Sequence, residues 1–161
     1  YTGAGLSILL KNKKFSKKFG AKAKNSVFKP KCSLMFGLNN KRYFSSSMDS
    51  SDGLSTTLNE MSNQSKKKFI ITAMPSENDL FEFAAANNLD PNDLILNGGE
   101  EYEIVATASK SELKKIKKYA KKHRIRLYEI GYVTKGRGVF YKKNGKMIKI
   151  KDKGWQHLQK R

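Results

Sequence analysis

Apolar positions recur along the chain at two different periods, which predict helices alternating with strands. Leu54, Leu58 and Met61 lie three or four residues apart, as on one face of a helix, whereas residues 68–73 form an apolar run of strand length. On these criteria we expect helices at residues 4–10, 53–62, 76–88, 90–95 and 109–120. Strands are expected at residues 42–48, 68–73, 101–108, 126–133 and 139–141, with 101–108 central in its sheet.

Turn and cap signals divide these elements. Asn144-Gly145 is the strongest hairpin signal in the chain, and it joins residues 140–141 to residues 147–148. Capping boxes are predicted for Ser76 with Asp79 and for Ser109 with Glu112. The lysine-rich residues 11–40 predict a loop followed by a short helix.

The alternation of strands with helices, ending in a hairpin, predicts an α/β (α+β) fold in which helices pack on a mixed sheet. The chain has 161 residues, of which 38% are hydrophobic, so it is long enough for one domain with a core. The single cysteine, Cys32, excludes an internal disulfide, and no run approaches the roughly 20 apolar residues of a membrane span. A cytoplasmic protein without a membrane partner is therefore expected.

Charge is distributed unevenly along the chain, which has a formal net charge of +19. Residues 1–48 contain 11 Lys/Arg and no acid, residues 49–103 contain 3 and 11, and residues 104–161 contain 19 and 3. An acidic middle between basic flanks suits a magnesium site inside a basic shell that attracts anionic small molecules. The lysine face of the helix predicted at 109–120 is interpreted as a solvated outer face.

The acidic turn, residues 49–53, is the first acidic segment of the chain. Asp49 and Asp52 fall where the predicted strand passes to the predicted helix, and Gly53 follows them. A helix start offers backbone N–H groups to phosphate, and magnesium typically takes one or two carboxylates together with substrate oxygens. The alternative is that Asp52 only caps the helix.

Two further segments carry unusual residues, namely the glycine segment, residues 98–103, and Gly154-Trp155-x-His157. Together with the acidic turn, the opening Thr2-Gly3-x-Gly5-Leu6 and residues 130–133, they resemble the C-terminal domain of thiamine-monophosphate kinase, within the aminoimidazole ribonucleotide synthetase-like superfamily. The resemblance spans nearly the whole chain. The glycine segment departs from the family form Gly-Gly-Glu-Asp-Tyr-Glu by one residue, because Glu101 stands in place of the aspartate.

The resemblance implies transfer of the terminal phosphoryl group of ATP to thiamine monophosphate, giving thiamine diphosphate. By this likeness Asp49 and Asp52 ligate Mg²⁺ and Ser51 contacts ATP. Glu100 hydrogen-bonds the thiamine moiety, and Trp155 stacks on one of its rings. No residue is assigned as catalytic, because phosphoryl transfer depends mainly on positioning and charge neutralisation. His157 is expected to be structural.

The resemblance also bears on domain organisation. Residues 1–161 are expected to form the single C-terminal domain of a longer two-domain kinase whose N-terminal ATP- and magnesium-binding domain is absent. In the family that domain forms the homodimer and supplies most of the magnesium ligands. The 161 residues alone are therefore expected to bind ATP weakly and to catalyse no turnover.

Two alternatives stay open. One is another ATP-dependent synthetase or maturation protein of the same superfamily, which thiamine monophosphate would not inhibit. The other is a basic nucleic-acid-binding module, suggested by the net charge. The second is disfavoured, because such a module needs aromatic residues interleaved with basic residues on one face, whereas here the aromatics fall mainly on expected core positions.

Overall fold

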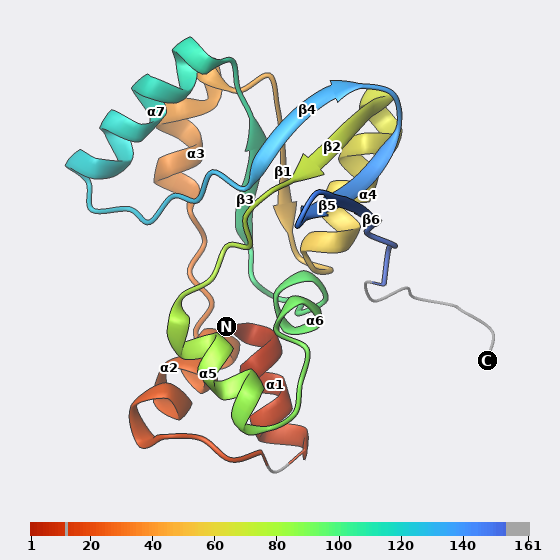
Figure 1. Cartoon of the computed structure of the whole chain (residues 1–161). Helices are drawn as coiled ribbons and strands as arrows, with labels where there is room; N and C mark the ends of the chain where they lie inside the picture. The colour runs from red at the N-terminus through yellow and green to blue at the C-terminus, as the bar shows by residue number, and fades with distance from the viewer. Residues whose placement is uncertain (12, 154–161) are drawn as a thin grey trace, which may run out of the picture.

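The computed structural model describes residues 1–11 and 13–153, and these form two connected regions (Figure 1). The lower region in Figure 1 is helical and consists of α1 (Thr2–Lys11), α2 (Lys17–Phe28), α5 (Asn78–Ala86) and α6 (Pro91–Leu96). The upper region holds the strands together with α3 (Leu34–Asn40), the 3₁₀ helix η1 (Lys41–Tyr43), α4 (Leu54–Ser65) and α7 (Lys110–Lys122).

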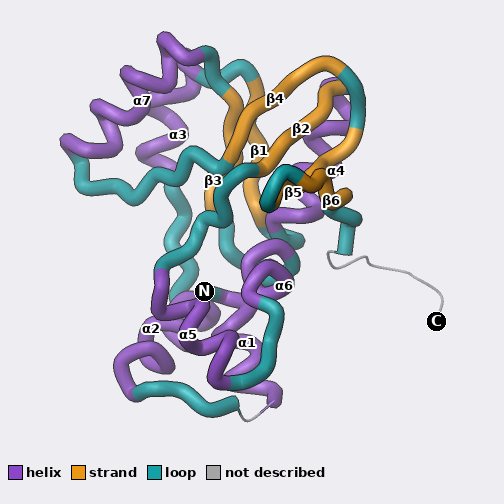
Figure 2. The backbone as a smooth tube through the Cα atoms, in the orientation of Figure 1, coloured by secondary structure: helices purple, strands orange, loops and turns teal. Residues whose placement is uncertain are grey.

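The strands form a mixed four-stranded sheet and a separate two-stranded ribbon (Figure 2). The sheet has the order β4 (Gly131–Lys135), β2 (Lys67–Ile71), β5 (Gly138–Lys143), β6 (Lys146–Lys149). The β2–β5 pair is parallel and the other two pairs are antiparallel. The predicted fold class, a mixed sheet with helices packed on it, is confirmed.

Helix α4 connects the core to the sheet. Leu54, Leu58 and Met61 are buried at helical spacing, and they belong to one apolar cluster with Phe69 and Val139 of the sheet. The predicted helix is confirmed and continues to Ser65. Leu58 is only 1% exposed, so truncation to alanine would cost about 2–5 kcal/mol.

Helix α2 was not predicted, and the expectation of a loop there is wrong. Ser16 caps it by accepting a hydrogen bond from the Phe19 amide at 3.3 Å. Phe19 and Ala23 are buried one turn apart, and the Phe19 ring stacks on Phe83 at a centroid distance of 4.8 Å. Lysines within and beside this stretch hid the helical period, although lysine is a good helix former when its charged end reaches solvent.

Three strand predictions were partly wrong. Residues 41–43 form η1, and the strand that follows is β1 (Ser46–Ser50). The expected central strand, β3 (Glu103–Thr107), is instead an antiparallel partner of β1, and among the described residues it pairs with no other strand. β4 begins at Gly131 rather than at residue 126, and Arg126 instead forms an ion pair of 2.6 Å with Glu77 at the helical region.

The two predicted capping boxes had different outcomes. Ser109 accepts a hydrogen bond from the Glu112 amide at 3.3 Å and caps α7 as predicted. Ser76 does not cap α5, whose N-cap position is held by Glu77. The side chains of Glu77 and Asp79 both form ion pairs with Lys22 at the start of α5.

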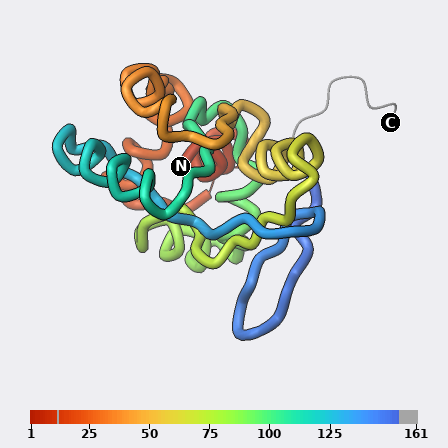
Figure 3. The backbone as a smooth tube through the Cα atoms, turned by 90° about the horizontal axis from the view of Figure 1, so that it is seen from above, coloured from red at the N-terminus to blue at the C-terminus, as the bar shows by residue number. Residues whose placement is uncertain are grey.

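The predicted hairpin is confirmed. Asn144 and Gly145 both have positive φ, 49° and 76°, as the two central residues of a type I′ turn require. The turn pairs Lys143 with Lys146, and the β5–β6 hairpin projects from the body in the view of Figure 3. No helix in the described part of the chain combines the length and the apolar character needed to cross a membrane.

Candidate functional site

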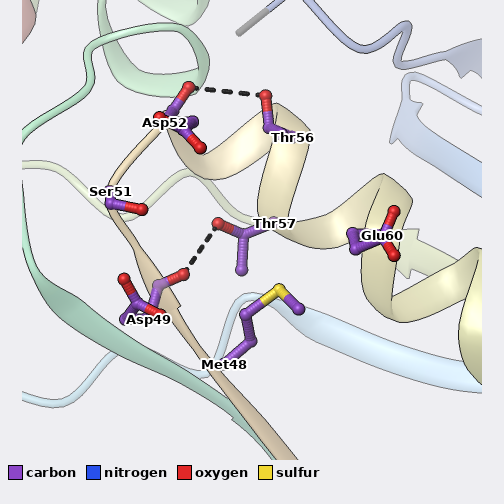
Figure 4. Close-up of a pocket in the computed structure, with 7 residues that line it drawn as sticks. All are labelled: Met48, Asp49, Ser51, Asp52, Thr56, Thr57 and Glu60. Carbon is purple, nitrogen blue, oxygen red and sulfur yellow. Dashed lines mark hydrogen bonds between the residues drawn. The ribbon is translucent and has the colours of Figure 1, made fainter. Parts of the chain in front are cut away.

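The acidic turn joins β1 to α4 and lines a pocket (Figure 4). Asp49 lies near the end of β1, Ser51 and Asp52 follow it, and Gly53 immediately precedes α4. The pocket has a volume of about 230 Å³ and is lined by Met48, Asp49, Ser51, Asp52, Thr56, Thr57 and Glu60. The structure therefore brings together the three predicted residues of this turn, and the predicted passage from strand to helix is confirmed.

The backbone of the turn is held by a threonine and a glycine rather than by an aspartate. Gly53 occupies the N-cap position of α4 with φ of 99°, and no side chain caps the helix there, so the alternative that Asp52 is the cap is wrong. The Thr57 hydroxyl, 3% exposed, donates to the carbonyls of Asp49 at 3.1 Å and Gly53 at 3.2 Å. The turn is thus fixed without use of the carboxylates.

The two carboxylates of the turn are exposed, and within residues 1–11 and 13–153 neither makes a hydrogen bond or an ion pair. A third carboxylate at the pocket, Glu60, accepts a hydrogen bond from Gln64 at 2.6 Å. The described residues contain no group of three or more His, Cys, Asp or Glu side chains arranged to hold one metal ion. Asp49 and Asp52 therefore suit a magnesium ion shared with substrate phosphates, which needs only one or two carboxylates, and not a closed all-protein site.

The glycine segment packs directly on the acidic turn. The Glu100 amide donates to the Ser51 carbonyl at 2.6 Å, and the Tyr102 amide donates to the Ser50 carbonyl at 3.0 Å. A Cβ added at Gly99 would lie 2.9 Å from the Ser51 carbonyl oxygen, which is closer than side chains tolerate. Glycine is therefore required at residue 99 so that the two segments can approach each other.

Glu100 is held beside the turn in a left-handed backbone conformation. Its φ is 63° and that of Tyr102 is 51°, values that non-glycine residues adopt rarely and often at functional sites. The Tyr102 hydroxyl donates to the Glu100 carboxylate at 2.5 Å. This hydrogen bond raises the pKa of Tyr102, and the charges of Asp49 and Asp52 raise it further, so the three carboxylates contribute to one electronegative region.

Glu101, the residue that departs from the family form, has a structural partner. Its carboxylate accepts a hydrogen bond from the Thr2 hydroxyl at 2.9 Å, and Thr2 is 2% exposed. Burial raises the pKa of Glu101, although the Thr2 hydrogen bond favours the charged form. A Cβ at Gly98 would lie 2.6 Å from the Gly3 nitrogen, so the opening Thr2-Gly3 packs on the glycine segment.

Sequence reasoning did not identify several residues that line the pocket. Thr56 and Glu60 follow Asp52 at intervals of four residues, so they lie on the same face of α4 as the acidic turn. This spacing was available from the sequence, but threonine and glutamate on a helix give no signal by themselves. Trp155 and His157, predicted from the third segment, lie outside the described residues.

The profile of the family described as AIR synthase related protein, C-terminal domain, matches residues 45–143. The chain belongs to this family, and further comparisons confirm the resemblance to thiamine-monophosphate kinase. A protein of that name from Nitrosopumilus maritimus is 55% identical over 159 residues, which cover 99% of this chain and 50% of the relative. Another from Pyrococcus horikoshii is 32% identical over 156 residues, which cover 96% and 46% of the two chains.

A solved structure agrees with the sequence comparisons. "AaThiL complexed with AMPPCP and TMP" superposes with a TM-score of 0.77 at 28% identity, and the match covers 98% of this chain and 48% of that chain. The chain thus spans about half the length of the curated relatives and the solved structure that it matches.

Proposed function

We propose that the chain contributes part of the active site of a thiamine-monophosphate kinase, which transfers the terminal phosphoryl group of ATP to thiamine monophosphate. The observation that carries the proposal is the direct hydrogen bonding of the glycine segment to the acidic turn. It puts Glu100 beside two carboxylates that have no partner among the described residues. The 55% identical relative bears the name of this enzyme, and AaThiL was solved with AMPPCP and TMP.

Asp49 and Asp52 would hold magnesium, and Ser51 would contact ATP from the same turn. Bound magnesium would neutralise charge on the phosphate oxygens. The first N–H groups of α4 have no intrahelical partners and add positive potential at the turn. Glu100 would hydrogen-bond the thiamine moiety, and Trp155 would stack on one of its rings, because a carboxylate and an indole face suit a cationic aromatic ligand.

The rest of the active site would come from outside these residues. The relatives are about twice as long, and the described residues contain no group of three or more His, Cys, Asp or Glu side chains that could hold a metal ion without further ligands. We propose that an N-terminal domain supplies the remaining ligands and forms a homodimer, and that the enzyme works in the cytoplasm. Residues 1–161 alone would then catalyse no turnover.

A hybrid protein tests the proposal. These 161 residues replace the matching residues of the Nitrosopumilus maritimus relative, and thiamine diphosphate formed from ATP and thiamine monophosphate is measured with and without magnesium. We expect magnesium-dependent turnover by the hybrid within about tenfold of the unmodified relative, and none by the 161 residues alone. A folded hybrid that hydrolyses ATP but forms no thiamine diphosphate would overturn the assigned substrate, and turnover by the 161 residues alone would overturn the divided site.

A further inference from the structure

The segment that follows β6, residues 150–153, is fastened along one side of α4. The Thr56 hydroxyl donates to the Asp152 carboxylate at 2.7 Å, and the side-chain nitrogen of Asn59 donates to the Ile150 carbonyl at 3.3 Å. The Lys153 amide donates to the Ser55 hydroxyl at 3.5 Å. We call these contacts the α4 seam. Residue 153 immediately precedes Gly154-Trp155 in the sequence.

Ser55 is the member of the seam that also contacts Asn97, the residue before the glycine segment. Its hydroxyl donates to the Asn97 side-chain oxygen at 2.8 Å, and Asn97 immediately precedes Gly98. Ser55 is 0% exposed and lies two residues after Gly53, the last residue of the acidic turn. One buried hydroxyl on α4 therefore contacts both the residue before the glycine segment and residue 153.

The hydrogen-bonding capacity of serine matches this arrangement. A hydroxyl has one donor and two acceptor lone pairs, so it can donate to Asn97 while it accepts from the Lys153 amide. Alanine would remove both interactions without adding volume. Asn97 is itself oriented, because its amide nitrogen donates to Asp93 at 2.7 Å. The hydrogen bond to Asp93 therefore orients the Asn97 side chain with its oxygen toward Ser55.

We propose that Ser55 is a positioning residue that holds Asn97, and with it the adjoining glycine segment proposed to bind thiamine, against α4 and residue 153. It touches neither substrate nor metal. The inference rests on the proposed function, because it assigns Ser55 a role in binding thiamine monophosphate. Its loss would raise the KM for thiamine monophosphate while the KM for ATP stays nearly unchanged, since the turn that carries Asp49, Ser51 and Asp52 keeps the hydrogen bonds that Thr57 donates to its backbone.

Ser62 provides a matched control on the same helix. It is also 0% exposed, donates to the Lys67 carbonyl at 2.6 Å and accepts from the Gly138 amide at 2.9 Å. It therefore resembles Ser55 in burial and in its two hydrogen bonds. Ser62 contacts the start of β2 and of β5 and lies two turns from the acidic turn. Ser62→Ala loses comparable contacts without loosening the site.

Amide hydrogen exchange of the 161-residue chain tests the seam without reference to any activity. In Ser55→Ala we expect the Lys153 amide to exchange several-fold faster, whereas the Ile150 amide keeps its protection through its bond to the Val139 carbonyl at 2.9 Å. In Ser62→Ala the Gly138 amide should exchange faster instead. Unchanged exchange at Lys153 in Ser55→Ala would overturn the seam as a constraint.

Steady-state kinetics of the hybrid test the positioning role. We expect Ser55→Ala to raise the KM for thiamine monophosphate about fivefold and to change the KM for ATP less than twofold, as loss of a hydrogen bond implies. Ser55→Cys, a weaker donor of similar shape, should lie between Ser55→Ala and the parent. Equal KM values in Ser55→Ala and Ser62→Ala would overturn the role. An unmodified hybrid without thiamine-monophosphate turnover would instead count against the proposed function.

Discussion

Two pairs of acidic residues in this chain have opposite surroundings. Glu77 and Asp79, at the start of α5, both contact Lys22, at 2.6 and 2.9 Å, and Glu77 also pairs with Arg126. Asp49 and Asp52, on the acidic turn, have no basic partner among residues 1–11 and 13–153. The chain has 33 Lys/Arg and only 14 Asp/Glu, so a partner would be easy to supply.

The difference separates acids that stabilise the fold from acids that are available to a ligand. The Tyr1 hydroxyl donates to both Glu77 and Asp79, and the Lys22 ammonium lies 3.9 Å from the centre of the Tyr1 ring. This paired cluster joins α2 and α5 to the residue that precedes α1. Asp49 and Asp52 contribute nothing comparable to the fold, because Thr57 and Gly53 hold their turn through the backbone.

The largest expected effect comes from removing charge at the acidic turn. Asp49→Asn combined with Asp52→Asn in the hybrid should lower kcat/KM at least about 100-fold, because magnesium loses both carboxylate ligands. The melting temperature should stay the same or rise, since two like charges that have no partner are removed. Enzyme assays and thermal unfolding of the same preparation check both parts.

An exposed carboxylate away from the pocket serves as the control for charge alone. Glu82→Gln on α5 removes one negative charge without touching the turn, so activity should remain within about twofold of the parent. If the double variant at the turn kept its activity, or lost it only together with its fold, Asp49 and Asp52 would belong with the structural acids and the contrast would fail.

The next effect concerns stability. Glu77→Gln combined with Asp79→Asn should lower the free energy of unfolding by about 1–2 kcal/mol, because the ion pairs are about one-third exposed and solvent screens them. Activity of the hybrid should fall less than threefold under conditions where it stays folded. Urea unfolding of the 161 residues measures the first quantity. A stability loss as small as that of Glu82→Gln would show that the paired cluster is not stabilising.

The same cluster predicts how stability depends on pH. Hydrogen bonds from Lys22 and Tyr1 lower the pKa of Glu77, and they lower that of Asp79 despite the opposing effect of burial, from ordinary values of 4.5 and 3.8. The unfolded chain then binds protons more readily than the folded chain. The contribution of Glu77 and Asp79 to the free energy of unfolding is therefore present above about pH 4.5. It is lost as the pH falls through their lowered pKa values. Urea midpoints at pH 3 to 6 should converge for parent and double variant at the acid end.

The sequence predicted α4, β2 and the β5–β6 hairpin well, because there a local signal agreed with the tertiary contacts. Asn144-Gly145 fixed the hairpin because the turn type depends on those two residues alone. Prediction from the sequence failed where a contact with a residue distant in the chain holds the segment. Arg126, predicted in a strand, pairs with Glu77, and Lys22 pairs with Glu77 and Asp79 at the start of α5. Neither contact has a signature in the local pattern.

For the site, sequence reasoning found the chemically distinctive residues but not the connections between them. Asp49 and Asp52 were conspicuous because no acid precedes them, and resemblance singled out Glu100. The hydrogen bond from the Glu100 amide to Ser51 arises only after folding. Ser55 and Thr57 escaped notice because a buried serine or threonine on a helix resembles any other until its partners are known.

The smallest effect distinguishes a direct ligand from a distant charge at the pocket. Glu60 lines the pocket but accepts a hydrogen bond from Gln64, so Glu60→Gln should raise the magnesium concentration for half-maximal activity less than about threefold. At a salt concentration of about 0.5 M this change in magnesium dependence should vanish, because an exposed charge acts through solvent and is screened. The loss of activity in Asp52→Asn should persist at this salt concentration, because salt does not replace a missing metal ligand. An effect of Glu60→Gln that persists in salt would place Glu60 among the metal ligands. The metal site would then extend along α4 as far as residue 60.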